Sequence, residues 1–182
     1  MENEKFRNII LTGMRGSGKT TLGKLLAKEL NMDFIDTDKE IEESEEITIS
    51  EMVERFNWEY FRKKEKECIE KVSKEVRNSI ISTGGGVILY EENIINLKKN
   101  GVIVFINTPV EILSRRIKNT QTRPSLTGKN VQEELGQVWI ERKDKYLESA
   151  DFVYDKNNER LNKDDALGII QLITDYELRI TN

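Results

Sequence analysis

Short runs of β-branched and other apolar residues alternate along the chain with charged stretches whose apolar positions recur every three or four residues. The runs predict buried strands and the charged stretches predict amphipathic helices. The strand-like runs are Ile9-Ile10-Leu11, Phe34-Ile35, Ile80-Ile81, Val102-Ile103-Val104-Phe105-Ile106 and Phe152-Val153. Strands that alternate with helices form a parallel sheet covered on both faces, so the pattern predicts an α/β fold. In such sheets a ligand site lies in the loops beyond the carboxyl ends of the strands.

Composition narrows the class of protein. The chain has 182 residues, of which 34% are charged and 37% hydrophobic, as expected for one soluble domain with a heavily charged surface. No apolar run approaches the ~18–20 residues that span a bilayer, so we expect no membrane segment. The acidic start Met1-Glu2-Asn3-Glu4-Lys5 does not resemble a secretory signal, which favours a cytoplasmic location. The net charge of −4, with both signs interspersed, does not predict a nucleic-acid partner.

The chain contains no histidine, and Cys68 is its one cysteine. This composition excludes a histidine general base, a histidine-ligated zinc site, a Ser-His-Asp triad and an internal disulfide. Catalysis would have to use carboxylates, lysine, arginine, hydroxyl groups or a hard metal ion. We expect Cys68 to be a small core residue and not a nucleophile.

A phosphate-binding motif directly follows the first strand-like run. The P-loop pattern of Gly, four residues and Gly-Lys-Ser/Thr is matched by Gly13-Met14-Arg15-Gly16-Ser17-Gly18-Lys19-Thr20. Its glycines let backbone N–H groups turn toward phosphate oxygens, and the helix expected at 21–30 adds positive potential. Lys19 is expected to reach the β- and γ-phosphates of a nucleotide, and the Thr20 hydroxyl to ligate Mg²⁺. The alternative is a glycine-rich turn before a helix; the order of strand, turn and helix favours the nucleotide site.

Two carboxylates follow the second strand-like run, in Asp36-Thr37-Asp38. If strand geometry continues through them, Asp36 and Asp38 face the same cleft, because residues two apart on a strand project to one side. Beside a P-loop, a carboxylate either holds the water shell of a metal ion or orients the hydroxyl group that is phosphorylated. The alternative is that one of the two only caps the next helix.

Two arginines fall on apolar helix faces. Arg142 lies on the stripe formed by Val131, Leu135, Val138, Trp139 and Tyr146, and Arg62 lies on the face formed by Trp58, Phe61, Cys68, Ile69, Val72 and Val76. An inward charge needs an anionic partner, which is either another side chain or a ligand. Glu65, three residues after Arg62, is expected to hold that guanidinium so that it can grip a second carboxylate. Internal salt bridges or surface arginines are the alternative.

Two further segments have the composition of a ligand site. Thr83-Gly84-Gly85-Gly86 ends the third strand-like run, and consecutive glycines suit a close approach to the main chain. A polar segment at about 119–130, with Arg123-Pro124 inside it, interrupts the helical pattern and suits a lid that closes over a transferring phosphate. A tight turn and an ordinary surface loop are the respective alternatives.

In combination, these features resemble the shikimate kinases over nearly the whole chain. The matching pieces are the P-loop, Asp36-Thr37-Asp38, Phe61-Arg62 with Glu65, Gly84-Gly85-Gly86, Arg123-Pro124 and Arg142. The resemblance implies a single domain over 1–182 with a P-loop kinase fold of the nucleoside-monophosphate-kinase type: a five-stranded parallel sheet, substrate-binding helices at about 38–76 and the lid at about 119–130. It implies transfer of the γ-phosphoryl group of ATP to the 3-hydroxyl of shikimate, in aromatic amino-acid biosynthesis. The implied cofactor is Mg²⁺, and we expect a monomer.

The resemblance also assigns roles to residues. Those implied for ATP are Gly13, Arg15, Gly16, Ser17, Gly18, Lys19, Thr20, Thr21, Arg116 and Arg123. Those implied for shikimate are Asp38, Arg62, Gly84, Gly85, Gly86 and Arg142. Lys19, Asp38 and Arg123 are implied in catalysis, and Mg²⁺ would bind Thr20 directly and Asp36 through water.

The chain departs from the family pattern in three places. Asn57-Trp58 stands where Gly-Glu is common, no proline follows Asp155 beside the expected adenine site, and Ser125 stands where leucine is more usual. Two other functions are the alternatives: a kinase of the same fold acting on gluconate or a nucleoside monophosphate, and a nucleotide-binding module without turnover. Two inward arginines disfavour a nucleobase acceptor, and the presence of Lys19, Asp38 and Arg123 disfavours a module that has lost its activity.

Overall fold

A computed structural model describes residues 8–118, 131–157 and 160–180. Its strands are β1 (Asn8–Thr12), β2 (Asp33–Asp36), β3 (Ser79–Ser82), β4 (Val102–Asn107) and β5 (Phe152–Asp155). They form one five-stranded sheet in the order β2-β3-β1-β4-β5, and every neighbouring pair is parallel. The predicted α/β fold with a five-stranded parallel sheet is therefore confirmed.

Eight α-helices and one short 3₁₀ helix connect these strands within the described residues. They are α1 (Lys19–Leu30), α2 (Thr37–Glu45), α3 (Ile49–Phe56), α4 (Trp58–Glu75), η1 (Val87–Leu89), α5 (Glu91–Lys98), α6 (Val110–Lys118), α7 (Val131–Ser149) and α8 (Lys163–Ile180). None of the helices in these ranges is long and apolar enough to cross a membrane.

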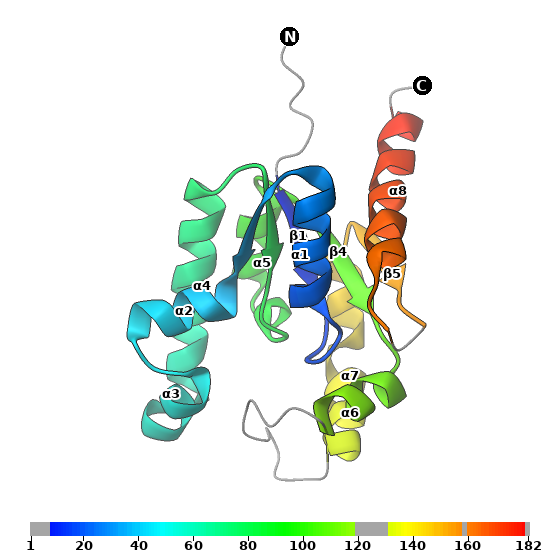
Figure 1. Ribbon diagram of the computed structural model, residues 1–182. Coiled ribbons are helices and arrows are strands. Elements are labelled where there is room, and N and C mark those ends of the chain that lie inside the picture. Colours follow the sequence, from blue (N-terminus) through cyan, green and yellow to red (C-terminus); the bar gives the residue numbers. More distant parts are fainter. Residues whose placement is uncertain (1–7, 119–130, 158–159, 181–182) are drawn as a thin grey trace.

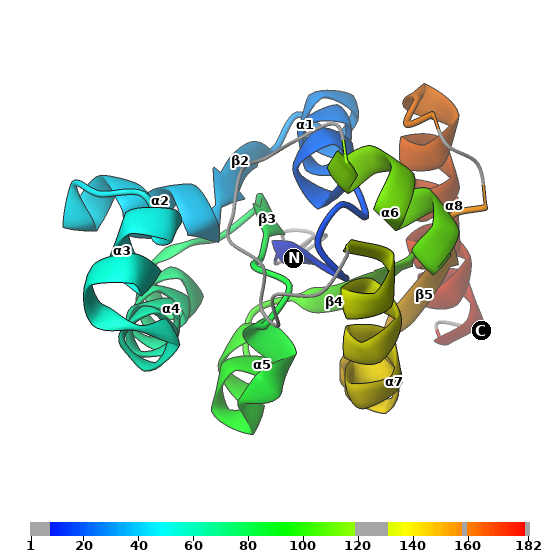
Figure 2. The same cartoon turned by 90° about the horizontal axis from the view of Figure 1, so that it is seen from below.

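The sheet has a hydrophobic core on each face. On β1, Ile9 and Leu11 pack on one side and Ile10 on the other, since alternate residues of a strand point to opposite faces. Figure 2 shows α1 and α8 over one face and α5 and α7 over the other, which agrees with the membership of the two clusters. Because both faces of the sheet are covered, each strand contains adjacent apolar residues, as the sequence pattern predicted.

A smaller cluster joins α2, α3 and α4 beyond the β2 edge of the sheet (Figures 1 and 2). Its buried members are Ile41, Ile49, Met52 and Phe61. The Tyr60 hydroxyl of α4 donates to Glu45 of α2 at 2.7 Å, and the Lys64 ammonium forms an ion pair with the same carboxylate at 2.9 Å. Hydrogen bonds from Tyr60 and Lys64 lower the pKa of Glu45 below its usual value. The region expected at about 38–76 to hold substrate thus consists of three helices that pack on one another.

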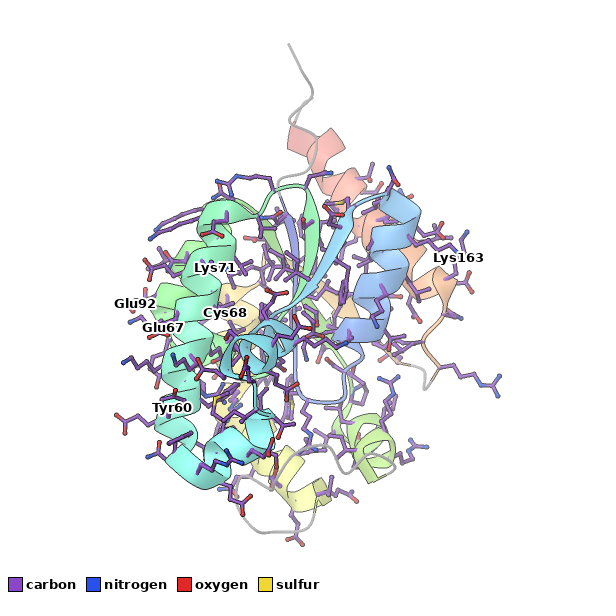
Figure 3. The ribbon with its side chains drawn as sticks, turned by 60° about the vertical axis from the view of Figure 1, so that its left-hand side comes forward. Tyr60, Glu67, Cys68, Lys71, Glu92 and Lys163 are labelled. Carbon is purple, nitrogen blue, oxygen red and sulfur yellow. The ribbon has the colours of Figure 1, made fainter. Side chains whose placement is uncertain are left out.

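Helix α4 also contacts the body of the protein. Lys66 forms an ion pair with Glu92 of α5, and the Cys68 thiol lies 3.8 Å from the Thr37 carbonyl oxygen. Figure 3 shows Cys68 among the labelled residues Tyr60, Glu67 and Lys71 of α4, with Glu92 beside them. Cys68 packs against two of the hydrophobic clusters, as expected for a core residue, and burial raises the pKa of its thiol to about 12.

Candidate functional site

The P-loop joins β1 to α1 and needs glycine at three positions. Gly13, Gly16 and Gly18 have φ angles of 148°, 82° and 95°, which side chains of L-residues rarely adopt. A Cβ atom at Gly13 would also lie 2.8 Å from the Ile106 carbonyl oxygen. The loop therefore wraps closely around its own centre and opens at the start of α1, where helix N–H groups are available to an anion.

The Lys19 side chain lies along the inside of this loop. Its ammonium donates to the carbonyl oxygens of Gly13 at 2.8 Å and Met14 at 3.0 Å, and it lies 3.4 Å from the Ser17 hydroxyl. Lys19 is buried, so its positive charge lies inside the loop. The buried Ser17 hydroxyl is one of the groups that surround the Lys19 ammonium.

A cavity of about 960 Å³, counted with its opening to solvent, lies beside the P-loop; we call it the P-loop cavity. Its wall contains Arg15, Gly16, Gly18, Lys19, Thr20, Thr21, Asp38, Ser82, Thr83, Gly85, Arg116, Ile117 and Leu161. Arg116, expected on the adenine side, donates to the carbonyl oxygens of Gly16 at 3.1 Å and Ser17 at 3.3 Å. Most residues implied for ATP thus surround one cavity, with Gly13 and Ser17 shaping the loop behind it. Arg123 and the expected lid lie outside the described residues.

Asp36 and Thr20 meet at the mouth of the P-loop. The Thr20 hydroxyl donates to Asp36 Oδ2 at 2.7 Å, and Asp36 Oδ1 accepts from the Asp38 backbone N–H at 3.2 Å. Asp36 is the N-cap of α2, which begins at Thr37. The expectation that strand geometry continues to Asp38 is therefore wrong. The physical reason is that a carboxylate that satisfies an exposed helix N–H favours a helix start at that point. Asp36 caps α2, but capping is not its only contact, since its other oxygen accepts from Thr20.

Asp38 still reaches the site, from the first turn of α2. A Cβ atom at Gly84 would lie 2.8 Å from Asp38 Oδ1 and 2.7 Å from Glu65 Oε1. The two carboxylates therefore flank the glycine triplet. Only a residue without a side chain fits between them, which explains the first glycine of the run.

Arg62 and Glu65 pair as predicted from their spacing on α4. The Arg62 guanidinium lies 2.8 Å from Glu65 Oε2, and Glu65 is fully buried. The guanidinium carbon also lies 5.0 Å from the Phe61 ring centroid and 5.6 Å from that of Trp58. Two aromatic rings and a carboxylate thus fix the direction of the fork.

Arg142 approaches the glycine triplet from α7. Its Nη1 atom lies 3.4 Å from the Gly85 carbonyl oxygen, which also accepts from the Tyr146 hydroxyl at 2.5 Å. Tyr146 is fully buried and stacks on Phe105 at 4.9 Å between centroids; burial raises the pKa of its hydroxyl well above the usual value. None of the acidic side chains in the described ranges forms an ion pair with Arg142.

The two arginines line a second cavity, of about 570 Å³ with its opening, which we call the arginine cavity. Its wall contains Met14, Arg15, Trp58, Arg62, Gly85, Gly86, Glu134, Leu135, Val138, Arg142 and Tyr146. A Cβ atom at Gly86 would overlap the Arg62 guanidinium. Arg15 and Gly85 border both cavities, so the arginine cavity adjoins the P-loop cavity at the glycine triplet. This arrangement suits the transfer of a group between two bound molecules.

The inward position of both arginines agrees with the helical pattern, and their opening into one cavity agrees with what the resemblance implied. Among the wall residues that the pattern did not identify as parts of the site are Leu161 and Ser82 in the P-loop cavity, and Glu134 and Tyr146 in the arginine cavity. Tyr146 carried one usable signal, because it stands one helical turn after Arg142 on the same stripe. Leu161 carried none, since its place depends on how the segment after β5 folds.

Known proteins resemble this chain in both sequence and structure. A family model described as shikimate kinase matches residues 15–174. A shikimate kinase of Caldanaerobacter subterraneus subsp. tengcongensis is 38% identical over 86% of this chain and 91% of its own length, and one of Caldicellulosiruptor saccharolyticus is 49% identical over 66% of this chain and 69% of its own. The solved structure of shikimate kinase from Acinetobacter baumannii in complex with shikimate has a TM-score of 0.90 at 33% identity, covering 97% of each chain.

This chain belongs to the shikimate kinase family. The residues matched by the family model include the P-loop from Arg15 onward, Arg62 on α4 and Arg142 on α7. They also include the helices that border the arginine cavity. The chain is therefore a P-loop kinase, and the resemblance seen in its motifs is confirmed.

Asn57 marks a point where this shikimate kinase family member departs from the usual pattern. It stands between α3 and α4 with φ 96° and ψ 172°, a conformation that belongs essentially to glycine. Its side chain accepts from the Tyr60 N–H at 3.1 Å and caps α4. The backbone thus keeps the geometry that glycine adopts easily, and the side chain adds a helix cap. The next residue, Trp58, lines the arginine cavity.

Proposed function

We propose that this protein is an ATP-dependent shikimate kinase that phosphorylates the 3-hydroxyl of shikimate. The observation that supports this most directly is the convergence of Arg62 and Arg142 on a cavity beside the P-loop. Arg62 has a protein carboxylate at 2.8 Å, whereas Arg142 forms no ion pair with any described residue. A guanidinium in a partly enclosed site favours an anionic partner, and the carboxylate of a small acid would supply one.

The carboxylate of shikimate would lie between the two guanidinium groups. Glu65, Trp58 and Phe61 restrict the orientation of Arg62, so less conformational entropy is lost when it forms two parallel hydrogen bonds. The ring of the substrate would lie against Gly85 and Gly86, where the main chain is accessible. Its hydroxyl groups would then point toward the P-loop cavity, which also borders Gly85.

ATP would occupy the P-loop cavity with its phosphates inside the loop. Lys19 and the start of α1 would bind the β- and γ-phosphates, and Arg116 would border the adenine. We propose the same role for Arg123 as the sequence suggested, closing over the transferring phosphoryl group. The reaction needs positioning and charge neutralisation more than covalent chemistry.

The residues present fit a Mg²⁺ ion. The Thr20 hydroxyl and the Asp36 carboxylate, 2.7 Å apart at the mouth of the P-loop, are the hard oxygen donors that this ion prefers. No group of three or more acidic or cysteine side chains forms a metal cage within the described ranges, and Mg²⁺ usually keeps water and phosphate ligands instead of such a cage. When bound, the ion supplies positive charge to the phosphate oxygens; Thr20 and Asp36 would hold it, Asp36 through water.

Asp38 would accept the hydrogen bond of the attacking hydroxyl group and orient it toward the γ-phosphate. We expect Asp38→Asn to lower kcat by at least about 100-fold, within the range of general-base contributions, while ATP still binds. Steady-state kinetics together with calorimetric titration of ADP measures both quantities. Near-normal turnover would remove Asp38 from the mechanism.

A coupled assay of ADP release tests the function itself. We expect turnover with shikimate and none above background with gluconate, AMP or CMP. Turnover with one of the other acceptors would reassign the substrate. ATP binding without acceptor-dependent ADP release would favour a nucleotide-binding module.

We also propose a cytoplasmic location and a monomeric state. Cell fractionation would test the first, and light scattering would test the second.

A further inference from the structure

A buried ion pair lies beside the P-loop cavity without lining it. Lys156 directly follows β5, and Asp165 lies in the first turn of α8. Lys156 Nζ and Asp165 Oδ1 are 3.0 Å apart, and the two side chains are only 1% and 5% exposed. The Tyr154 hydroxyl also donates to Asp165 Oδ1, at 3.1 Å. Charges are seldom buried this completely, because each loses its hydration. The presence of this pair therefore needs an explanation.

Both members of the pair also hold backbone groups of the segment between β5 and α8. Lys156 Nζ donates to the Arg160 carbonyl oxygen at 2.8 Å, and Asp165 Oδ2 accepts from the Asn162 N–H at 2.9 Å. Asn162 Oδ1 in turn accepts from the Asp165 backbone N–H at 3.1 Å. Arg160 and Asn162 are the two neighbours of Leu161 in the chain. The ion pair therefore fixes the backbone on each side of that residue.

Leu161 is the point at which this segment meets the nucleotide site. Its side chain lines the P-loop cavity and packs on Gly18, where a Cβ atom would lie 2.9 Å from Leu161 Cδ2. Figure 1 shows the segment after β5 at the same end of the sheet as the loop between β1 and α1. An isobutyl group offers no hydrogen bond to a phosphate, so its partner in a bound nucleotide is the less polar base or ribose.

We propose that the Lys156–Asp165 ion pair is a positioning device that sets nucleotide affinity by holding Leu161 against the P-loop cavity. The proposal rests on the proposed function, since it takes the occupant of that cavity to be ATP. Two properties of the pair support it. The pair is almost fully buried, and besides the Tyr154 hydroxyl its hydrogen bonds go to the backbone on both sides of one wall residue. Hydrophobic residues of similar size would fill the same space but could not hold those two peptide groups.

The test removes both charges while keeping the hydrogen bond from the Asn162 N–H to residue 165. In Lys156→Met/Asp165→Asn, neither charge is left alone in the core, and the asparagine can still accept from Asn162. We expect the Kd for ADP and the KM for ATP to rise about five- to tenfold, the size of one lost apolar contact. We expect kcat and the KM for shikimate to change less than about twofold. A general loss of structure would instead change all four quantities.

Two further variants show whether the effect passes through Leu161. Leu161→Ala alone should weaken ADP binding by a similar factor, and adding it to the double variant should weaken binding little further. The matched control is Lys98→Met/Asp151→Asn, which removes another lysine–aspartate pair at 2.8 Å that lies outside both cavities. The control should bind ADP like the unaltered protein.

Calorimetric titration of ADP, with no acceptor present, separates the possible outcomes. If the unaltered protein binds no ADP, the proposed function fails and this inference fails with it. If the unaltered protein binds ADP and Leu161→Ala binds it equally well, only the inference is overturned. Additive losses in the triple variant would also overturn it, because they would mean that the ion pair does not act through Leu161.

Discussion

At the scale of single residues, the site depends on the two half-buried guanidinium groups of Arg62 and Arg142. Arg62 is fixed by a carboxylate and two aromatic rings, whereas Arg142 contacts the Gly85 carbonyl oxygen at 3.4 Å and the Tyr146 hydroxyl and has no ion pair with a described residue. The weaker hold on Arg142 leaves more of its hydrogen-bonding capacity for a ligand. Its removal should therefore affect substrate binding more than folding.

We expect Arg142→Ala to raise the KM for shikimate at least about tenfold and the KM for ATP less than about threefold. Loss of a hydrogen bond to a charged group costs about 1.5–3 kcal/mol, which corresponds to this range. Steady-state kinetics with each substrate varied in turn measures the ratio. Arg77→Ala is the control, because that exposed arginine binds only backbone oxygens at the far end of α4. Equal effects on both KM values would contradict the assigned role.

Gly86→Ala tests the shape of the arginine cavity while leaving its charged residues in place. The Cβ atom of Gly86→Ala would overlap the Arg62 guanidinium, so we expect the KM for shikimate to rise about tenfold or more while ADP binding stays unchanged. Gly136→Ala on α7 is the matched change, since nothing lies within 4 Å of its added Cβ atom. That variant should keep its activity and gain about 1 kcal/mol of stability, because glycine is a poor helix former. Thermal melts and kinetics on both variants test the contrast.

At the scale of elements, the junctions decide where functional groups lie. Asp36 ends β2 and caps α2 in one step, so Asp38 enters the site from a helix and not from a strand. Alternating polarity could not reveal this, because strand extension and helix capping compete at the same residues. Asn57 shows a similar competition between α3 and α4, where a cap coexists with an unfavourable backbone conformation.

We expect Asn57→Gly to stabilise the protein by about 1 kcal/mol. The strained conformation costs about 1–3 kcal/mol in a residue with a side chain, and replacing an asparagine cap by glycine costs only a few tenths. Asn57→Ala should instead destabilise the protein by about 1 kcal/mol, because it loses the cap and keeps the strain. Urea unfolding of the three proteins provides the comparison. If Asn57→Gly were the less stable of the two variants, the argument from strain would be wrong.

At the scale of the whole molecule, burial of weak acids makes stability depend on alkaline pH. Burial raises the pKa of Cys68 from 9.0 to about 12, and burial together with Asp165 raises that of Tyr154 from 10.0 to about 12. Between these values the unfolded chain loses protons that the native protein keeps. The contribution of these two groups to the free energy of unfolding is therefore fully present below pH 9, and it decreases as the pH rises toward 12.

Cys68→Ala should reduce this alkaline loss. A fully linked group contributes about 1.4 kcal/mol per pH unit, and Cys68 is only partly buried, so we expect about 1 kcal/mol of difference between pH 8 and pH 10.5. Urea unfolding at both pH values, for the unaltered protein and the variant, measures it. Parallel loss in the two proteins would show that the thiol does not contribute.

The sequence by itself determined the five strands, their parallel arrangement and most of the chemistry. Apolar runs fixed the strands because both faces of a parallel sheet are buried, and the P-loop glycines fixed a backbone that other residues rarely adopt. The spacing of Arg62 and Glu65 fixed their ion pair, because residues three apart on a helix face each other.

Only the tertiary structure decided which of these groups meet. The Tyr146 hydroxyl bonds Gly85, and Leu161 packs on Gly18, through contacts between segments far apart in the chain. Such contacts follow from packing of the whole core and leave no periodic signal in the local sequence. Local patterns record which side of an element is buried, whereas the partner on that side is set by how helices and strands pack together.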